Sequence, residues 1–586
     1  MITRIIEAKS TLLFIVLLAA VGAICTTATN AFFFEGSGTE NDPYLIKDAE
    51  DLRLLSEYVN MGEPFGGIYF LQTADIDLEG EEWTPIGLFE SGNYFFGIYD
   101  GGGHVIRNLV TPQMGNNGFF GMLGGTVANL GIESGVIFGE YVGAISSDAV
   151  DSNALIINCY SKAIVMGKYR SGGIADNFDG SIINCWSDCD YLSSDCTGGI
   201  TSYNAMLVEG CFSNSELING NFTGNMKMSA KLSKKLLQSE SLCDMLNSEL
   251  PAYLRKYEFV NQLIPWKTDK AGLCFDKEKK VDRSSPVENS NRGTVENPYI
   301  IDHADDLLLL RDMVNGGVDF SDTYFLQTGD IDLSGEEWIP IGIFESGKYF
   351  FGTYDGGGHI ISNLVTQKTG NNGFFGMLGG TVVNLGIESG CIYGDYIGSI
   401  ASHAACTEAQ IINCYNKADL IGKYRAGGIA DNFAGKIVNC WSSCSITSEQ
   451  TGGIVSYNAQ YINNCYSTYD IIPHTFSGVK KNSISYNIRA VKSDQPWKKL
   501  NAGLVYCAPY FKEGINLAKW TEGQQFSGEY FSLKSVSPLL LIEAYSFQFV
   551  IVLLVLTSIM MLLLFNYVLL KRRSGSKNGN DFEKSA

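Results

Sequence analysis

Two carboxylates spaced two residues apart are the side chains in this sequence best suited to chemistry. Asp75 and Asp77 occur in "ADIDL", and alternate residues of a strand point to one face, so both would face the same way. Asp100 follows in "YDGGG", and His104 lies four residues further on. Paired carboxylates can hold a cation or act as acid and base, so these residues are the candidates for a metal site or a glycan-cleaving site.

A second set of the same residues favours a structural role. Each has a counterpart 255 positions later in nearly identical surroundings, and these are Asp330, Asp332, Asp355 and His359. An Asp before Gly commonly caps a turn by accepting hydrogen bonds from backbone N–H groups. We therefore predict no catalytic residues, no cofactor and no metal site, and we expect that the chain is not an enzyme.

Other motifs of known chemistry are absent from the sequence. His303, His403 and His474 stand alone, and the sequence contains neither H-E-x-x-H nor C-x-x-C. The formal net charge is −21. This charge argues against nucleic acid as a partner, because binding to phosphates needs clustered Lys and Arg.

A long internal repeat organises the chain. Between Glu90–Gly135 and Glu345–Gly390, 38 of 46 positions are identical. Repeats of this length are whole structural units, so the body should contain two copies of one domain. We predict copy 1 at residues 36–275, a linker at 276–291 and copy 2 at 292–510.

A shorter period lies inside each copy. Cys159, Cys185 and Cys211 are spaced 26 residues apart, and pieces such as "ALIINCY" alternate with glycine-rich corners. Units this short cannot bury their own apolar face, so they must stack as parallel β-coils about 4.8 Å apart. Asparagines recur in the same frame and should pass side-chain hydrogen bonds from coil to coil. The column comprises Asn108, Asn129, Asn158 and Asn184 in copy 1, and Asn363, Asn384, Asn413, Asn439 and Asn464 in copy 2.

The chain has 15 cysteines, which in an extracellular domain can form disulfides. A fixed framework would keep both members of every pair in both copies, but five cysteines face other residue types in the second copy: Cys196, Cys243, Cys274, Cys391 and Cys406. We therefore favour buried apolar thiols, with Cys189 and Cys196 as the most plausible local disulfide. Asn221 begins the only glycosylation sequon. Four positions are cysteine in both copies: Cys159, Cys185, Cys189 and Cys211, matched by Cys414, Cys440, Cys444 and Cys465.

Both ends of the chain have the composition of membrane signals. Residues 1–31 place Arg4 and Lys9 before an apolar stretch and small residues, which is the plan of a secretory signal peptide. An uncleaved N-terminal anchor is the alternative. Residues 549–570 carry no charge, and 22 residues are enough to cross about 30 Å of hydrocarbon as a helix.

The basic residues after that stretch predict the topology. Lys571, Arg572 and Arg573 follow at once, which places residues 571–586 in the cytoplasm. Residues 511–545 would then form a juxtamembrane stalk, and the body would lie outside the cell. The predicted localisation is the cell membrane, with a single C-terminal membrane-spanning helix.

The order of the motifs resembles a known family. "FGIYDGGGHVIRNL", "GFFGMLGGTVANLGIESG" and the "GGIAD" and "GGITS" series look like the GLUG-motif β-helix domains of microbial surface proteins. "GSGTENDPYLIKDAEDLRLLSEYVN" is similar to the strand and helix that cap such domains at their start. "LSKKLLQSESLCDMLNSEL" with Trp266 is similar to their C-terminal cap. Copy 2 has only the polar "VKKNSISYNIRAVKSDQPWKKL" there, so we expect its last coil to be poorly capped.

The predicted fold class is all-β, with two tandem right-handed parallel β-helix domains, small helical caps and a C-terminal transmembrane helix. The resemblance implies a surface protein that displays the two domains for adhesion or for binding an extracellular protein or glycan. One alternative is a polysaccharide lyase or hydrolase on the same scaffold, which would need a cluster of Asp, Arg or Lys in only one copy. Another alternative is a purely structural stalk.

Overall fold

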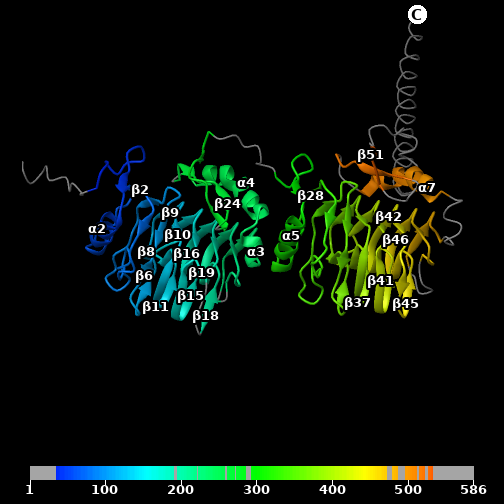
Figure 1. The fold of residues 1–586 in the computed structure, drawn as a ribbon, viewed down its shortest axis with the longest axis horizontal. Helices are drawn as coiled ribbons and strands as arrows, with labels where there is room; N and C mark the ends of the chain where they lie inside the picture. The colour runs from blue at the N-terminus through cyan, green and yellow to red at the C-terminus, as the bar shows by residue number, and fades with distance from the viewer. Residues whose placement is uncertain are drawn as a thin grey trace, which may run out of the picture.

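Two stacks of short parallel strands make up the computed structural model of this chain (Figure 1). The structure describes residues 34–531 except for 190–194, 219, 221, 258–259, 271, 285–291, 472–477, 486–494, 511–513 and 522–525. The predicted signal peptide and cytoplasmic tail lie outside the described residues, as does Asn221 of the sequon.

The transmembrane helix of the predicted fold class is not supported. Within the described part of the chain, no helix is both long and apolar enough to cross a membrane. The segment on which this prediction rested, residues 549–570, lies outside the described residues. The fold class is therefore corrected to two parallel β-solenoids with helical caps.

Three parallel sheets wrap around the core of copy 1. The ten-stranded sheet contains β1 (Tyr44–Ile46), β2 (Tyr69–Gln72), β4 (Ile98–Asp100), β8 (Phe120–Leu123), β9 (Thr126–Ala128), β12 (Ser146–Ala149), β13 (Leu155–Ile157), β16 (Ala175–Ile183), β19 (Thr201–Glu209) and β21 (Asn225–Lys227). The seven-stranded sheet contains β3 (Ile76–Asp77), β5 (Val105–Arg107), β10 (Gly131–Ile132), β14 (Tyr160–Ser161), β17 (Trp186–Ser187), β20 (Phe212–Ser213) and β22 (Ala230–Lys231). The five-stranded sheet contains β6 (Leu109–Val110), β7 (Asn116–Asn117), β11 (Gly135–Gly143), β15 (Ile164–Gly172) and β18 (Cys196–Gly198).

Copy 2 repeats this plan, which confirms the predicted parallel β-structure. Its ten-stranded sheet contains β27 (Tyr299–Ile301), β28 (Tyr324–Gln327), β30 (Thr353–Asp355), β34 (Phe375–Leu378), β35 (Thr381–Val383), β38 (Ala401–Ala404), β39 (Gln410–Ile412), β42 (Ala430–Val438), β46 (Val455–Asn463) and β48 (Val479–Lys481). Its seven-stranded sheet contains β29 (Ile331–Asp332), β31 (Ile360–Ser362), β36 (Gly386–Ile387), β40 (Tyr415–Asn416), β43 (Trp441–Ser442), β47 (Tyr466–Ser467) and β49 (Ile484–Ser485). Its six-stranded sheet contains β32 (Leu364–Val365), β33 (Asn371–Asn372), β37 (Gly390–Gly398), β41 (Asp419–Gly427), β44 (Ile446–Thr447) and β45 (Gln450–Gly452).

Asparagines in the left-handed region turn each coil at one corner. Asn129, Asn158 and Asn184 have φ of 51°, 55° and 53°, a conformation that asparagine tolerates better than most residues. Asn158 Nδ2 donates to Asn129 Oδ1 at 2.8 Å, and Asn184 Nδ2 donates to Asn158 Oδ1 at 2.9 Å. The predicted ladder of asparagine side chains is thus confirmed.

The first member of the predicted ladder needs correction. Asn108 donates instead to Asp77 Oδ1 at 2.8 Å, and its counterpart Asn363 makes the same bond to Asp332. The ladder itself begins at Asp100, whose Oδ1 accepts from Asn129 Nδ2 at 2.8 Å. A carboxylate, rather than an amide, therefore ends the hydrogen-bonded column.

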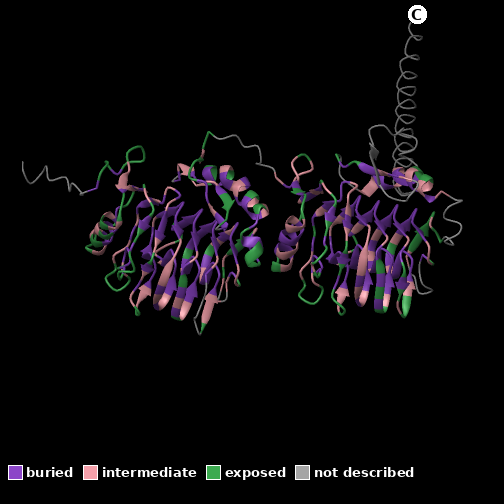
Figure 2. Cartoon of the chain, in the orientation of Figure 1, coloured by how far each residue is buried: buried purple, intermediate pink, exposed green. Residues whose placement is uncertain are grey.

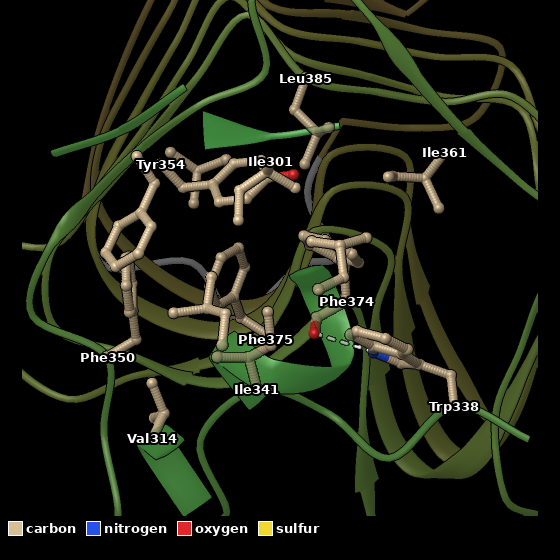
Figure 3. Packing of buried hydrophobic residues seen from close by; sticks show 14 of the residues in the cluster. Ile301, Val314, Trp338, Ile341, Phe350, Tyr354, Ile361, Phe374, Phe375 and Leu385 are labelled. Atoms are coloured by element: carbon tan, nitrogen blue, oxygen red, sulfur yellow. Dashed lines mark hydrogen bonds between the residues drawn. The ribbon is translucent and has the colours of Figure 1, made fainter. Parts of the chain in front are cut away.

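Aromatic side chains fill the interior of each copy. In copy 2, the rings of Trp338 and Phe374 stack with centroids 5.2 Å apart, and Trp338 Nε1 donates to the Phe374 carbonyl oxygen at 3.0 Å (Figure 3). Phe350, Tyr354 and Phe375 pack beside them, all fully buried. This packing makes the solenoid a filled core rather than a channel.

Helices and antiparallel hairpins cap the solenoids. The caps are α2 (Ala49–Asn60), α3 (Lys234–Leu237), α4 (Glu240–Lys256), α5 (Ala304–Gly316), α7 (Pro496–Gly503), the 3-10 helix η1 (Leu504–Tyr510), and the strand pairs β23 (Gln262–Leu263) with β26 (Val281–Asp282), β24 (Trp266–Asp269) with β25 (Gly272–Phe275), and β50 (Leu517–Trp520) with β51 (Phe526–Phe531). Asp48 caps the first turn of α2 by accepting from the backbone N–H groups of Glu50 and Asp51.

The two copies lie end to end, with α3 and α5 side by side between them (Figure 1). Leu308 and Leu309 of α5 are buried in one cluster with Leu236 and Leu237 of α3. In α2, at the free end of copy 1, the counterpart of Leu308 is the largely exposed Arg53. The C-terminal cap of copy 1 therefore shares one apolar cluster with copy 2, whereas the interior of copy 1 forms a separate cluster, and a cavity of about 450 Å³ remains at the junction.

The C-terminal cap of copy 2 differs from the prediction. The Asn501 side chain donates to the Trp520 carbonyl oxygen and accepts from the Trp520 backbone N–H, both at 2.9 Å. Asn247 and Trp266 make the same two bonds in copy 1, at 2.8 Å and 2.7 Å. Leu517 and Trp520 are buried, although the sequence analysis assigned residues 511–545 to a stalk. Copy 2 is therefore capped like copy 1, and its folded unit extends past residue 510.

All cysteines of the described residues are free thiols. Cys159, Cys185 and Cys211 form a buried column, and the Sγ of Cys185 accepts from the backbone N–H of Cys159. Burial raises the pKa of the Cys185 thiol well above its usual range. Cys189 and Cys196 are not bonded to each other.

Candidate functional site

The first predicted carboxylate, Asp75, lies in a cluster of basic side chains. Its oxygens contact His104 Nδ1 at 3.0 Å, Arg107 Nη2 at 3.2 Å and the Nζ of Lys277. Partial burial acts to raise the pKa of Asp75, but the hydrogen bonds from Lys277, His104 and Arg107 outweigh it and lower the pKa to about 2. Asp75 is therefore a permanently ionised partner of cations rather than an acid or base near neutral pH.

Copy 2 retains only part of this cluster. His359 Nδ1 contacts Asp330 Oδ1 at 3.1 Å, but Ser362 takes the place of Arg107. A charged cluster in only one copy is the feature that the enzymatic alternative would need. The cluster in copy 1 is partly exposed, and its carboxylate has three basic partners.

The other predicted carboxylates stabilise turns. Asp77 Oδ1 accepts from Asn108 Nδ2 and from the backbone N–H of Glu79, and these bonds lower its pKa. Asp100 accepts from the backbone N–H of Gly102 at 2.9 Å as well as from the ladder. Among the described residues, no group of three or more His, Cys, Asp or Glu side chains is arranged to hold a metal ion.

A surface of tyrosine and arginine on the outside of copy 1 was not predicted. The Arg170 guanidinium lies between the rings of Tyr141 and Tyr203, with its central carbon 4.6 Å and 4.8 Å from their centroids. Tyr169 packs against Tyr141 with centroids 5.4 Å apart. These four residues, the copy 1 Tyr–Arg surface, come from β11, β15 and β19 and are all partly exposed.

The same surface exists in copy 2. The central carbon of the Arg425 guanidinium lies 4.6 Å from the ring centroid of Tyr396 and 4.4 Å from that of Tyr457. The ring of Tyr424 packs against that of Tyr396. Tyr424 and Tyr457 are 36% and 43% exposed. In Figure 2, intermediate and exposed positions alternate with buried ones on the strands at the lower edge of both copies, where Figure 1 labels β11, β15, β37 and β41. We call Tyr396, Tyr424, Arg425 and Tyr457 the copy 2 Tyr–Arg surface.

A buried aspartate fixes each arginine. Arg170 Nη2 contacts Asp176 Oδ2 at 2.9 Å, and the Ser202 hydroxyl donates to Asp176, which is fully enclosed. In copy 2, Arg425 makes two bonds of 2.9 Å to Asp431. Such a pair holds the guanidinium in one orientation, so that each surface is pre-organised.

One ionisable position beside these pairs differs between the copies. In copy 1 it is Asp148, whose Oδ1 accepts from Asn177 Nδ2 at 3.3 Å. Burial, with a smaller contribution from the charge of Asp176, raises the pKa of Asp148 to about 7. In copy 2 the position is His403, which contacts the Ser402 hydroxyl and whose pKa is lowered by burial. The exposed residues of the two surfaces are therefore of the same types, but the ionisable side chain beneath them differs.

A signal for the Tyr–Arg surfaces does exist in the sequence. "KYRSGG" and "KYRAGG" are counterparts, and Tyr141 and Tyr203 have the counterparts Tyr396 and Tyr457. Their grouping depends on the coil register, which pairs Tyr141 with Arg170. Unequal coil lengths hid that register from the sequence.

The fold and these surfaces define a tandem parallel β-solenoid with a repeated aromatic and basic outer face. No family model matches the chain. A protein named "Putative Gly-rich membrane protein" from Evansella cellulosilytica is 31% identical over 142 residues, which is 23% of this chain and 16% of that protein. Halomucin from Haloquadratum walsbyi is 32% identical over 149 residues, which is 23% of this chain and 2% of halomucin.

The matched part is thus a small fraction of either relative. One solved structure, titled "a putative immunoglobulin A1 protease from Bacteroides ovatus", matches at 16% identity over 84% of this chain and 95% of that chain. Its TM-score is 0.22. The named relatives include a membrane protein.

Proposed function

We propose that this chain is a cell-surface protein that displays two β-solenoid domains for adhesion, by binding an extracellular protein or glycan. The observation that carries the proposal is the duplicated Tyr–Arg surface. Tyr and Arg are the residue types that most often dominate binding energy at interfaces, because they offer large rigid contacts and several hydrogen-bond donors. Two equal surfaces on one chain also increase avidity for a repetitive ligand.

The likeness to a membrane protein and the resemblance of the glycine-rich motifs to GLUG-motif domains support a surface location. Both supports concern the scaffold, whereas the ligand must be argued from the site itself. The arginines are paired with Asp176 and Asp431. Lys168 and Lys423, which lie over the rings of Tyr169 and Tyr424, have Glu140 and Asp395 nearby, so the surfaces offer aromatic area and N–H donors with little net positive charge. This chemistry suits a neutral glycan or a polar protein surface better than a polyanion.

The enzymatic alternative depends on Asp148, the carboxyl with a pKa near neutrality. A general acid or base at this place would need a second group that touches substrate, but Asp176 is enclosed by Arg170 and Ser202. We infer that the chain binds without catalysis. Glycan cleavage by the purified protein that is lost in Asp148→Asn without a change in thermal stability would favour the enzyme.

An array of glycans and extracellular proteins tests the binding function. The full chain should bind a restricted set of ligands, and the double variant Tyr169→Ser/Tyr424→Ser should lose them. These tyrosines lie outside the Arg–Asp pairs, so the fold should be retained. No bound ligand, or the same ligands bound equally by the double variant, would refute the proposal.

A further inference from the structure

Copy 1 contains a pocket at a place where copy 2 buries a tyrosine. The pocket has a volume of about 210 Å³ and lies between the first coils and the C-terminal cap. Its walls include the apolar side chains of Ile98, Ala128 and Val260, the ring of Tyr69, and the polar side chains of Asp100 and Gln262.

In copy 2 a tyrosine closes the same place. Tyr324, the counterpart of Tyr69, is only 6% exposed, and its hydroxyl donates to Asp355 Oδ2. Val383 packs in one cluster with Tyr324 and Ile515. The carboxylate of Asp355 is thus satisfied from within the protein.

In copy 1, Tyr69 does not cover the equivalent carboxyl group of Asp100 in this way. It is only half-buried, and within the described residues no hydrogen bond joins it to Asp100. Three replacements account for the open space. Ala128 is smaller than its counterpart Val383, and Glu40 replaces Val295. The carbonyl oxygen of Gln262 accepts from Asn129 of the ladder, and that of Asn516 accepts from Asn384 in copy 2, so Gln262 and Asn516 are equivalent. The residue before each is therefore equivalent too, and Asn261 takes the place of the buried Ile515.

The open side of the pocket carries negative charge. Burial raises the pKa of Asp100, while hydrogen bonds from Asn129, Gly102 and Gln262 act to lower it. Glu40 is a second carboxylate, exposed at the rim. Two basic groups lie near the pocket: His104 contacts Asp75, and Arg283, whose charge acts on Tyr69, donates to the Val260 carbonyl oxygen. An enclosed carboxyl of this kind is best satisfied by a charged N–H donor.

We propose that this pocket of copy 1 binds a small organic ammonium, with its charged group at Asp100 and its apolar part against Ile98, Ala128 and Tyr69. Attraction between an ammonium and the face of a tyrosine ring adds to the ion pair. The volume lies below the range of about 300–1,000 Å³ typical of drug-sized ligands, which limits the ligand to about one ring or a short chain. This site is independent of ligand binding by the Tyr–Arg surfaces.

Titration of the full chain with benzylamine, protonated at pH 7, tests the proposal by calorimetry or ligand-observed NMR. We expect one binding site per chain and at least 10-fold weaker binding of benzyl alcohol, which has the same ring without the charge. Ala128→Val introduces the residue of copy 2 and should weaken benzylamine binding at least 10-fold with unchanged thermal stability. Tyr324→Phe is the matched control in copy 2 and should leave binding as it is.

A second variant keeps the test decisive if Ala128→Val folds poorly. Glu40→Val, which also carries the residue of copy 2, lies on the exposed rim and should weaken benzylamine several-fold while leaving benzyl alcohol unaffected. Equal binding of the amine and the alcohol, binding that survives both substitutions, or no binding at millimolar amine would overturn the proposal. None of these outcomes depends on whether the array identifies a ligand for the Tyr–Arg surfaces.

Discussion

Single asparagine and aspartate side chains determine how this solenoid is held together. Asn129 accepts from Asn158, donates to Asp100 and also donates to the Gln262 carbonyl oxygen of the cap. Asn158 likewise donates to Asn129 and to the Ile264 carbonyl oxygen, so both amides have partners on a neighbouring coil and in the cap. Removing one such group leaves others unpaired in a buried place, where the cost is largest.

The ladder can be tested with a matched pair of asparagines. Asn158 and Asn108 both have a φ of 55°, so alanine is strained equally at the two positions. Only Asn158 lies in the ladder, and Asn158→Ala should therefore lower the free energy of unfolding by about 1–3 kcal/mol more than Asn108→Ala does. Denaturant unfolding measures both, and equal losses would show that the column is not a ladder.

The raised pKa of Asp148 predicts a pH dependence of stability. In the unfolded chain this carboxyl titrates near a pKa of about 4, whereas burial raises its pKa to about 7 in the folded protein. Between these values the folded state holds a proton that the unfolded state releases, so stability falls as pH rises from about 4 to 7.

Asp148→Asn should remove that loss of stability. The variant should be more stable than the wild type at pH 8, by about 1 kcal/mol or more, since one unit of pKa corresponds to 1.36 kcal/mol. The difference should vanish at pH 4. Thermal unfolding of both proteins at pH 4 and pH 8 measures the difference in stability. The same difference at both pH values would contradict a raised pKa of Asp148.

Strands and caps show how far sequence reasoning reaches in this chain. The parallel coils, the asparagine column and the buried thiols follow from spacing within the repeat, because stacked coils place equivalent residues in register. The cap of copy 2 was missed because its sequence is polar. The two C-terminal caps share only a Leu-Asn pair and a tryptophan 19 residues after the asparagine. These are Asn247 and Trp266 in copy 1, and Asn501 and Trp520 in copy 2. The pocket was missed because it depends on the volume difference between Ala128 and Val383.

Trp520 tests the corrected boundary of copy 2. Its ring is buried, and its Nε1 donates to Asn413 Oδ1 at 2.8 Å. Trp520→Ala should lower the free energy of unfolding by about 3–5 kcal/mol, as expected for a tryptophan removed from a core. A residue of a stalk would show a change near zero in the same denaturant titration.

The whole molecule presents two equivalent outer surfaces on two solenoids that pack end to end. The packing of α5 on α3 joins the copies, so the two Tyr–Arg surfaces belong to one body. The surface location was predicted from the terminal segments and the family resemblance, and the absence of nucleic-acid partners, predicted from net charge, stays a prediction. The Tyr–Arg surfaces could not be predicted without the coil register in each copy.

The number of ligand molecules bound per chain tests the central claim most directly. With a ligand identified on the array, calorimetric titration of the full chain should give two sites of similar affinity. Tyr169→Ser and Tyr424→Ser should each reduce the number to one, because each variant alters one surface only. A single site in the wild type, or two sites that persist in both variants, would contradict the claim that the duplicated Tyr–Arg surfaces bind the ligand.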